Sequence, residues 1–179
     1  FSDFEFIIIN DGSTDNSYKI IKQYAENDKR IIPITQNNIG LTKSLNKGIQ
    51  MARGKYIARQ DADDQSLRNR FEVQLDIAKQ NKCKIIVSKA YVNQINKKYL
   101  WPLDKWINNI NNDVLMFRNI FIHGTLFIEK DIITKYSYNE DYVYAQDYEL
   151  MLRLWKKNFK IQFVREPLYI LKRYSTNIS

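Results

Sequence analysis

The sequence contains very little cysteine, histidine, glycine or proline. Its 179 residues include one cysteine, one histidine, five glycines and three prolines. One cysteine excludes an internal disulfide and a cysteine-based zinc site, and one histidine excludes a metal site with three histidine ligands. We expect Cys83 to be a small buried strand residue, and we expect His123, which interrupts an apolar run, to be a hydrogen-bonded packing residue.

Long apolar runs are also absent. No run approaches the roughly 20 residues that a membrane-spanning helix needs, and the first residues lack the layout of a secretory signal peptide. With 44% hydrophobic and 27% charged residues, the composition is that of a soluble globular protein, and the length suits one domain. These features predict a cytoplasmic location.

Positive charge exceeds negative charge. The chain has 28 Lys and Arg against 20 Asp and Glu, for a formal net charge of +8 and a pI of about 9.4. Such a balance is compatible with nucleic acid, an anionic membrane face or a phosphorylated substrate. Because the lysines are scattered and no nucleic-acid reader motif is present, we expect no nucleic-acid partner.

Strand and helix patterns alternate over the first 92 residues. Strands are predicted at 4–10, 30–34, 55–59 and 84–92, and helices at 17–27, 41–53 and 66–80. The alternation predicts a parallel sheet with right-handed crossovers and helices on both faces. The first strand should be covered on both faces, which is unusual at the start of a domain and suggests that a preceding strand is missing.

Individual positions in this half carry further expectations. Ile20, Ile21 and Tyr24 should face the sheet from the first helix, and Ser66 should cap the third. Gly48, inside the second helix, costs roughly 1 kcal/mol against Ala and so indicates a close approach to the sheet.

The alternation ends after residue 92. Residues 93–112 are polar and predict a loop or insertion, in which Tyr99, Trp101 and Trp106 either pack on the domain or form a stacking platform for a sugar or base. The remaining pattern predicts a short helix at 114–119, a strand at 121–128, a helix to about 157 and short strands at 161–164 and 168–171.

Aspartates follow two of the predicted strands. Asp11 ends the first strand, and Asp61, Asp63 and Asp64 follow the third. In open α/β sheets ligands bind beyond the carboxyl ends of the strands, where Asp61 and Asp63 could converge on a cation and Asp11 could accept a hydrogen bond from a nucleotide base. Taken one at a time, these residues are more commonly turn residues or a solvated acidic loop.

Asp147 lies at the start of the last predicted helix. A carboxylate there is stabilised by roughly 0.3–1 kcal/mol by the helix macrodipole, which is a sufficient structural reason for an aspartate. The same field favours the ionised form that a proton acceptor needs.

Several motifs occur in one order along this pattern: Asn10-Asp11-Gly12-Ser13-Thr14-Asp15, Asn38-Ile39-Gly40, Ala52-Arg53-Gly54-Lys55-Tyr56-Ile57, Asp61-Ala62-Asp63-Asp64 and Gln146-Asp147-Tyr148-Glu149-Leu150 with Arg153-Leu154. Over nearly the whole chain they resemble the family 2 glycosyltransferases of the GT-A fold. The resemblance implies a Rossmann-like three-layer α/β/α domain over residues 1–179 with a mostly parallel sheet. Residues 1–92 would form the nucleotide-sugar-binding half, and residues 93–179 the half that binds the acceptor and carries the catalytic base.

The resemblance also implies an inverting transferase that moves a sugar from a nucleotide-diphospho-sugar, most simply a UDP-sugar, to an acceptor hydroxyl. Asp11 would read the base, Asp61 would help to hold the nucleoside, and Asp63 would bind Mg²⁺ or Mn²⁺. Asp147 would be the general base. His123, in the segment His123-Gly124-Thr125, would contact acceptor or phosphate.

The implied role is bacterial surface polysaccharide, lipopolysaccharide or capsule synthesis, with a saccharide or lipid-linked saccharide as acceptor and a peripheral contact at the inner face of the membrane. Three features depart from the family pattern: the absent first strand, Gln146 where Glu is common, and Tyr174 where many members have a metal-binding His. They favour an alternative, a catalytically impaired nucleotide- or carbohydrate-binding module of the same fold.

Overall fold

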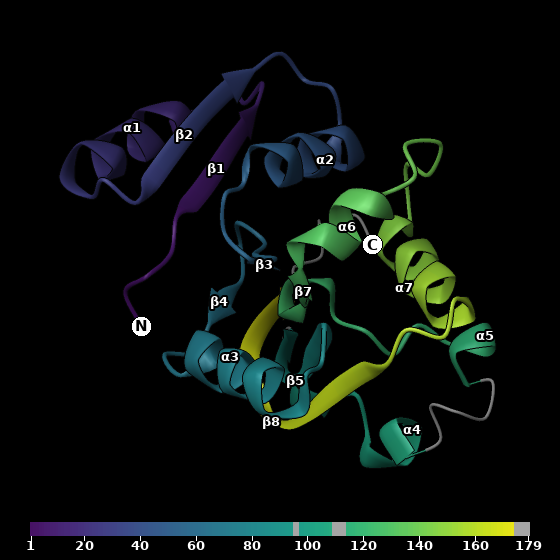
Figure 1. Ribbon diagram of the computed structural model, residues 1–179. Helices are drawn as coiled ribbons and strands as arrows, with labels where there is room; N and C mark the ends of the chain where they lie inside the picture. Colours follow the sequence, from purple (N-terminus) through teal and green to yellow (C-terminus); the bar gives the residue numbers. More distant parts are fainter. Residues whose placement is uncertain (95–96, 109–113, 174–179) are drawn as a thin grey trace.

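The computed structural model describes residues 1–94, 97–108 and 114–173, so Tyr174 lies outside the described residues. Figure 1 shows the elements, which in chain order are β1 (Phe6–Asp11), α1 (Ser17–Asn27), β2 (Ile31–Gln36), α2 (Leu41–Met51), β3 (Tyr56–Ala58), β4 (Gln65–Ser66), α3 (Arg70–Asn81), β5 (Ile85–Gln94), β6 (Lys97–Trp101), α4 (Asp104–Asn108), α5 (Leu115–Phe117), the 3-10 helix η2 (His123–Thr125), β7 (Phe127–Glu129), α6 (Lys130–Lys135), α7 (Gln146–Lys156) and β8 (Ile161–Arg173).

The strands form two sheets in the described residues. β1 and β2 make a parallel pair, and a six-stranded sheet has the order β3-β7-β5-β8-β4 with β6 paired to β5. The two parallel ladders, β1–β2 and β5–β8, are also the longest, while β3–β7, β5–β7, β5–β6 and β4–β8 are antiparallel. The α/β class and a mostly parallel sheet are thus confirmed, in a mixed form.

Helices cover both faces of the larger sheet. Along β5, Ile85 and Val87 pack in a core with α2, α6 and α7, while Ile86 between them packs with α3 on the opposite face. This alternation is the period of two that an extended strand imposes. Cys83 is buried in the α3 layer, as expected, but it lies two residues before β5 and not in a strand. Gly48 brings α2 against β1, where an added Cβ would lie 3.3 Å from Ile9 Cδ1.

The expectation that the first strand is covered on both faces is wrong. Phe6 is exposed and most of β1 is only half-buried, because β2 is its one ladder partner among the described residues. The expected inward face of α1 is also wrong in two of three positions: Ile21 is half-buried, but Ile20 and Tyr24 are 50% and 65% exposed. A two-stranded pair offers too little surface to bury a whole helix face.

Three local expectations are corrected. Ser66 pairs in β4 with β8 instead of capping a helix, and α3 begins at Arg70. The expected strand at 121–128 is a strand only from Phe127, because η2 occupies the preceding residues. The two short strands expected near the end are one strand, β8, with register shifts against β5.

The polar segment after residue 92 is more ordered than the expected loop. It holds β6, which continues β5 as an antiparallel hairpin, and α4. Trp106 packs on the main core and Trp101 on a smaller cluster, so both follow the packing alternative. Within the described residues, no helix combines the length and apolarity that would let it cross a membrane.

Candidate active site

Asp11 ties the end of β1 to the loop that precedes α2. Its carboxylate accepts the backbone N–H of Ile39 at 3.0 Å and of Gly40 at 2.9 Å, and the side-chain amide of Gln36 at 2.8 Å. Partial burial alone would raise the pKa of Asp11, but these hydrogen bonds outweigh it and lower the pKa. The ionised carboxylate therefore shapes the loop.

Gly12 shows why this turn needs glycine. Its φ is +81°, and an added Cβ would lie 2.8 Å from the backbone nitrogen of Asn38. The Asp-Gly pair and the Asn38 loop therefore approach each other too closely for a side chain.

The three aspartates after β3 form one acidic cluster. Asp64 is half-buried, and burial first, with the nearby Asp61 and Asp63 carboxylates, raises its pKa to about 6. Its Oδ1 accepts the Lys172 backbone N–H at 2.8 Å, while Oδ2 is buried without a partner. Negative charge around Asp64 is thus incompletely compensated, which is the condition that a bound cation relieves.

No group of three or more His, Cys, Asp or Glu side chains is arranged to hold a metal in residues 1–94, 97–108 and 114–173. Mg²⁺ is, however, commonly bound by one or two carboxylates together with substrate phosphates. Exposed Asp63, with Asp61 and Asp64 beside it, fits that kind of incomplete site.

Arg59 is a site residue that sequence reasoning missed. Its side chain is only 9% exposed and pairs with Asp61, and its Nε is buried without a partner. After burial, the charge of this guanidinium is the second cause that lowers the pKa of His123, and at Tyr138 it opposes the burial that raises the pKa. The sequence feature that could have indicated Arg59 is a basic residue at the end of a predicted apolar strand, two residues before Asp61.

His123 is held by Tyr138. The imidazole Nε2 lies 2.7 Å from the tyrosine hydroxyl, and burial first, then the Arg59 charge, lowers the pKa of His123 well below its usual value. The ring is therefore neutral at pH 7. A neutral imidazole can hydrogen-bond an acceptor hydroxyl but brings no positive charge to a phosphate.

Gly124 explains the position of Tyr169 on β8. A Cβ at residue 124 would lie 2.3 Å from the Tyr169 hydroxyl oxygen, so only glycine admits the ring. That hydroxyl accepts the Asp61 backbone N–H at 3.1 Å. The η2 turn and the acidic cluster are thereby positioned through one side chain.

Asp147 is the second residue of α7 and is half-buried. It lines a cavity of only about 10 Å³, room for about one water, with His123 and Tyr138, the remaining lining residues being Val87, Phe121, Ile122, Leu126, Leu150 and Met151. Its charge, like that of Asp61, raises the pKa of Tyr138, for which burial is the main cause. Asp147 and His123 therefore border the same tyrosine, while Asp61, 86 residues before Asp147 in the sequence, acts on it through its charge.

Comparison with known proteins gives one family. Residues 1–143 match the family model described as glycosyl transferase family 2. An uncharacterised glycosyltransferase of Methanocaldococcus jannaschii is 32% identical over 93% of this chain and 59% of its own length. An O-antigen biosynthesis glycosyltransferase of Escherichia coli is 34% identical over 86% of this chain and 61% of its own. The chain thus spans little more than half the length of these relatives.

Solved structures are similar in fold. TarS 1-349 of S. aureus, in complex with UDP-GlcNAc, has a TM-score of 0.77 at 15% identity, over 98% of this chain and 51% of that one. The mannosyltransferase PcManGT of Pyrobaculum calidifontis, in complex with GDP-Man and Mn²⁺, has a TM-score of 0.74 at 12% identity, over 96% and 48%. At these identities the likeness shows the fold.

Proposed function

Because the chain belongs to glycosyl transferase family 2, we propose that it transfers a sugar, with inversion, from a nucleotide-diphospho-sugar to an acceptor hydroxyl. Its fold is that of the GT-A glycosyltransferases, as the resemblance implied. A UDP-sugar is the proposed donor, since the related fold of TarS is seen with UDP-GlcNAc.

The donor would bind along residues 1–92. Asp11, at the end of β1, would accept a hydrogen bond from the base, and Asp61, fixed by Arg59 and Tyr169, would hold the nucleoside. Asp63 would bind Mg²⁺ or Mn²⁺, the latter being present in the PcManGT complex. The cation, when bound, would neutralise the charge that develops on the departing diphosphate.

Residues 93–179 would supply the acceptor side. The Asp147 carboxylate would take the proton of the acceptor hydroxyl while that oxygen forms a bond to the anomeric carbon. The bond from the anomeric carbon to the diphosphate oxygen breaks on the opposite face, which inverts the configuration. Neutral His123, held by Tyr138 in the same cavity, would orient the hydroxyl.

The observation that supports this assignment is that Asp147 lines one cavity with His123 and Tyr138, whose hydroxyl lies 2.7 Å from His123 Nε2. A proton acceptor on one side and donor-binding aspartates on the other are what a single displacement at carbon requires.

The proposed biological role is synthesis of a bacterial surface polysaccharide, with a saccharide or lipid-linked saccharide acceptor at the inner face of the membrane. An O-antigen biosynthesis enzyme and an amylovoran biosynthesis enzyme among the relatives support this role. The cytoplasmic location and a peripheral membrane contact are parts of the same proposal.

The test is turnover of nucleotide sugars in the presence of Mn²⁺. We expect Asp147→Asn to lower transfer by roughly 10²–10⁴-fold, the usual contribution of a positioned base, while donor binding measured by calorimetry is kept. Asp63→Asn should weaken donor binding in the presence of Mn²⁺. Asp131→Asn, which changes an exposed carboxylate on α6, is the matched control.

Equal rates in all four proteins would refute the assignment of these aspartates. Donor binding without turnover by any of them would instead identify the chain as a binding module of the same fold, the alternative that Gln146 in place of a family Glu favours.

A further inference from the structure

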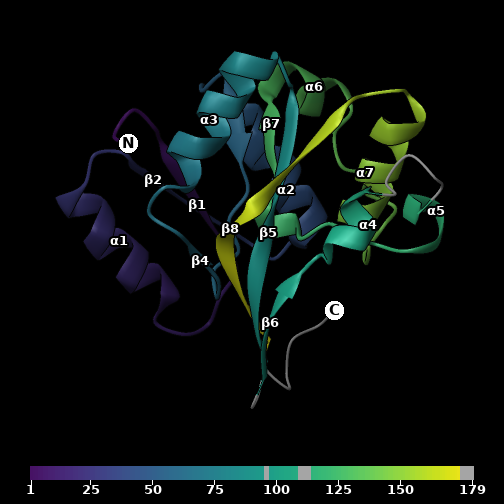
Figure 2. The same cartoon turned by 90° about the horizontal axis from the view of Figure 1, so that it is seen from below.

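The β5–β6 hairpin presents apolar side chains to solvent. Figure 2 shows these two strands reaching away from the helices, and the residues that β6 contributes are almost all exposed. Tyr99, Leu100 and Leu103 are 38%, 39% and 45% exposed. With Tyr91, Lys98 and Trp101 they line an open hollow of about 550 Å³.

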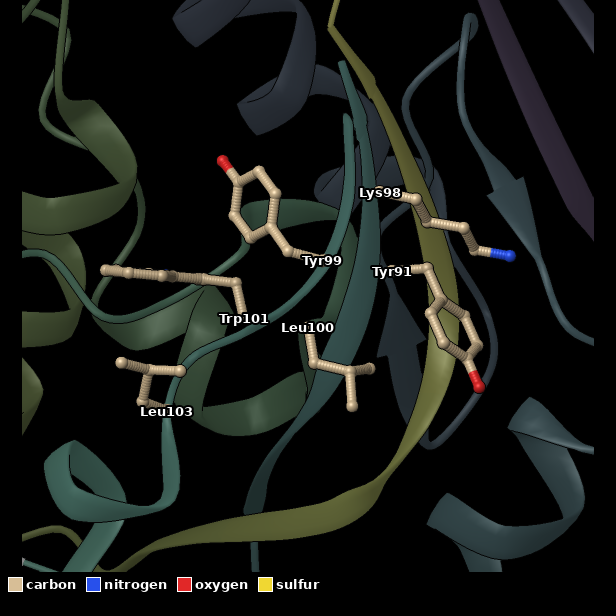
Figure 3. A pocket seen from close by; sticks show the side chains of 6 residues that line it. All are labelled: Tyr91, Lys98, Tyr99, Leu100, Trp101 and Leu103. Carbon is tan, nitrogen blue, oxygen red and sulfur yellow. The ribbon is translucent and has the colours of Figure 1, made fainter. Parts of the chain in front are cut away.

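The two faces of the hairpin are both apolar and aromatic. Figure 3 shows Tyr99 and Trp101 pointing to one side of the strand and Tyr91 and Lys98 pointing to the other. The ladder agrees, since Tyr91 lies opposite Leu100 on one face and Val92 lies opposite Tyr99 on the other. The exposed surface therefore follows the outer edge of β6 and wraps around it.

The charge on this hairpin has one sign. β5 and β6 hold three lysines and no acidic residue: Lys89 is buried and paired with Asp104, which leaves Lys97 and Lys98 as the exposed charges. Lys97 and Lys98 begin β6, both exposed, and the Lys98 ammonium lies 4.5 Å from the centre of the Tyr91 ring. Across β5, Gln94 pairs with Lys97 on one side and with Arg173 on the other, so the neighbouring strand adds a further cation.

The hairpin is also joined to the candidate active site. Trp101 lies opposite Ala90 and packs with Ile122 and Tyr169. Ile122 precedes His123, and the Tyr169 hydroxyl accepts the Asp61 backbone N–H. A partner bound to the hairpin would therefore lie beside the proposed donor and acceptor sites.

We propose that the hairpin surface, formed by Lys97, Lys98, Tyr99, Leu100 and Leu103, docks on an anionic phospholipid bilayer. Lysines meet lipid phosphates while tyrosine and leucine enter the boundary between headgroups and acyl chains, which is the distribution that interfacial anchors use. A second copy of the chain fits less well, because two such hairpins would bring like charges together. The proposal rests on the proposed function only for what the membrane delivers, a lipid-linked acceptor.

The test is flotation with lipid vesicles. The unmodified chain should float with vesicles of equal parts phosphatidylcholine and phosphatidylglycerol and stay behind with phosphatidylcholine alone. The double substitution Lys97→Gln with Lys98→Gln should lower the partition coefficient roughly thirty-fold, since each basic residue at such a surface contributes roughly a five-fold change in affinity.

The control is Lys19→Gln with Lys22→Gln. These exposed lysines lie on α1, away from the hairpin in both views, and their loss changes the net charge equally. An equal loss of binding in both double variants would overturn the proposal in favour of diffuse attraction. Failure of the unmodified chain to float with anionic vesicles, or its self-association through the hairpin, would overturn it as well.

Insertion is measured separately with an environment-sensitive dye. Leu100→Cys can be labelled selectively because the natural Cys83 is buried, and its emission should shift to the blue on anionic vesicles, whereas a label at Lys22→Cys should not respond. An unchanged Leu100→Cys signal would contradict insertion. These assays contain no sugar. A negative result would therefore contradict membrane docking without affecting the proposed glycosyl transfer, and a loss of transfer activity would not affect the docking result.

Discussion

Tyr138 is the residue around which the candidate site converges, although nothing in its sequence context marks it. It is buried, its hydroxyl bonds His123, and the charges of Arg59, Asp147 and Asp61 all act on its pKa. Its backbone is fixed at the same time by Asn46 of α2, which donates to the Tyr138 carbonyl and accepts the Tyr138 N–H. The side chains that the proposed chemistry needs are thereby held by one ring and its backbone.

The protonation of His123 provides a direct prediction. Because the chain has one histidine, its imidazole signal in a proton NMR spectrum can be assigned without further experiments. We expect that signal to stay in place from roughly pH 8 to 6, where an unperturbed histidine passes its pKa of about 6.5. Burial and the Arg59 charge are the causes.

The lowered pKa of His123 makes the free energy of unfolding depend on pH. A histidine whose pKa is lowered in the folded state binds its proton more readily in the unfolded chain, so its contribution to stability falls as pH drops below about 6.5. Arg59→Met should raise the pKa of His123 and Arg59→Lys should not. A midpoint near 6.5 in the unmodified protein would contradict a lowered pKa and a neutral ring at pH 7.

Among individual residues, the aspartates could be identified as candidates from the sequence, whereas the residues that hold their surroundings in place could not. Asp11, Asp61 and Asp147 follow strands or begin a helix, positions that local pattern identifies. Arg59 and Tyr138 act only because distant segments meet, and a local pattern carries no information about that. Direct contacts of Asp11, Asp61, Asp63, Asp147 and His123 with substrate stay predictions.

At the level of elements, one buried side chain joins the segments that carry the site. Arg70, the first residue of α3, is fully buried and donates to the carbonyls of Arg59 and Leu126 and to Ser66 and Gln74. Gln74 in turn donates to the Thr125 carbonyl. The end of β3, the β4 turn and η2 are thereby held against α3.

Arg70→Met should therefore lower the free energy of unfolding by roughly 3 kcal/mol or more, because several buried acceptors would lose their donor. Chemical denaturation followed by circular dichroism measures the change. Arg68→Met, two residues earlier and exposed, is the matched control. A loss below about 1 kcal/mol would show that water replaces the guanidinium in this network.

The elements themselves were predicted unevenly. Helices α2 and α7 were expected close to where they occur, because their apolar spacing is regular. The segment around η2 was misread as strand because its apolar side chains are buried by a turn, which periodicity cannot distinguish from a strand. β5 was expected close to where it occurs, but β6 was missed because its exposed side carries no polar alternation.

For the whole molecule, binding of donor and cation should increase the free energy of unfolding. UDP at about one hundred times its dissociation constant should add about 2.7 kcal/mol to the free energy of unfolding. We expect Mn²⁺ to increase this stabilisation and a chelator to remove the increase, measured by thermal unfolding. Asp63→Asn should abolish the Mn²⁺ dependence, and the exposed Asp76→Asn on α3 should keep it.

A stabilisation by UDP that is the same with Mn²⁺ and with chelator would contradict the assignment of Asp63 as a metal ligand. It would leave the role of Asp147 untouched, because proton transfer and cation binding are assigned to different segments of the chain.

The sequence by itself determined the α/β class, the family and the identity of the aspartates, because these depend on local pattern and on motifs in a fixed order. Only the tertiary structure decided that Asp147 borders the same cavity as His123, that His123 is a neutral, half-buried partner of Tyr138, and that β6 stands exposed with two lysines. The reason is physical: burial, charge environment and pKa are set by neighbours distant in sequence, and a linear pattern does not contain them.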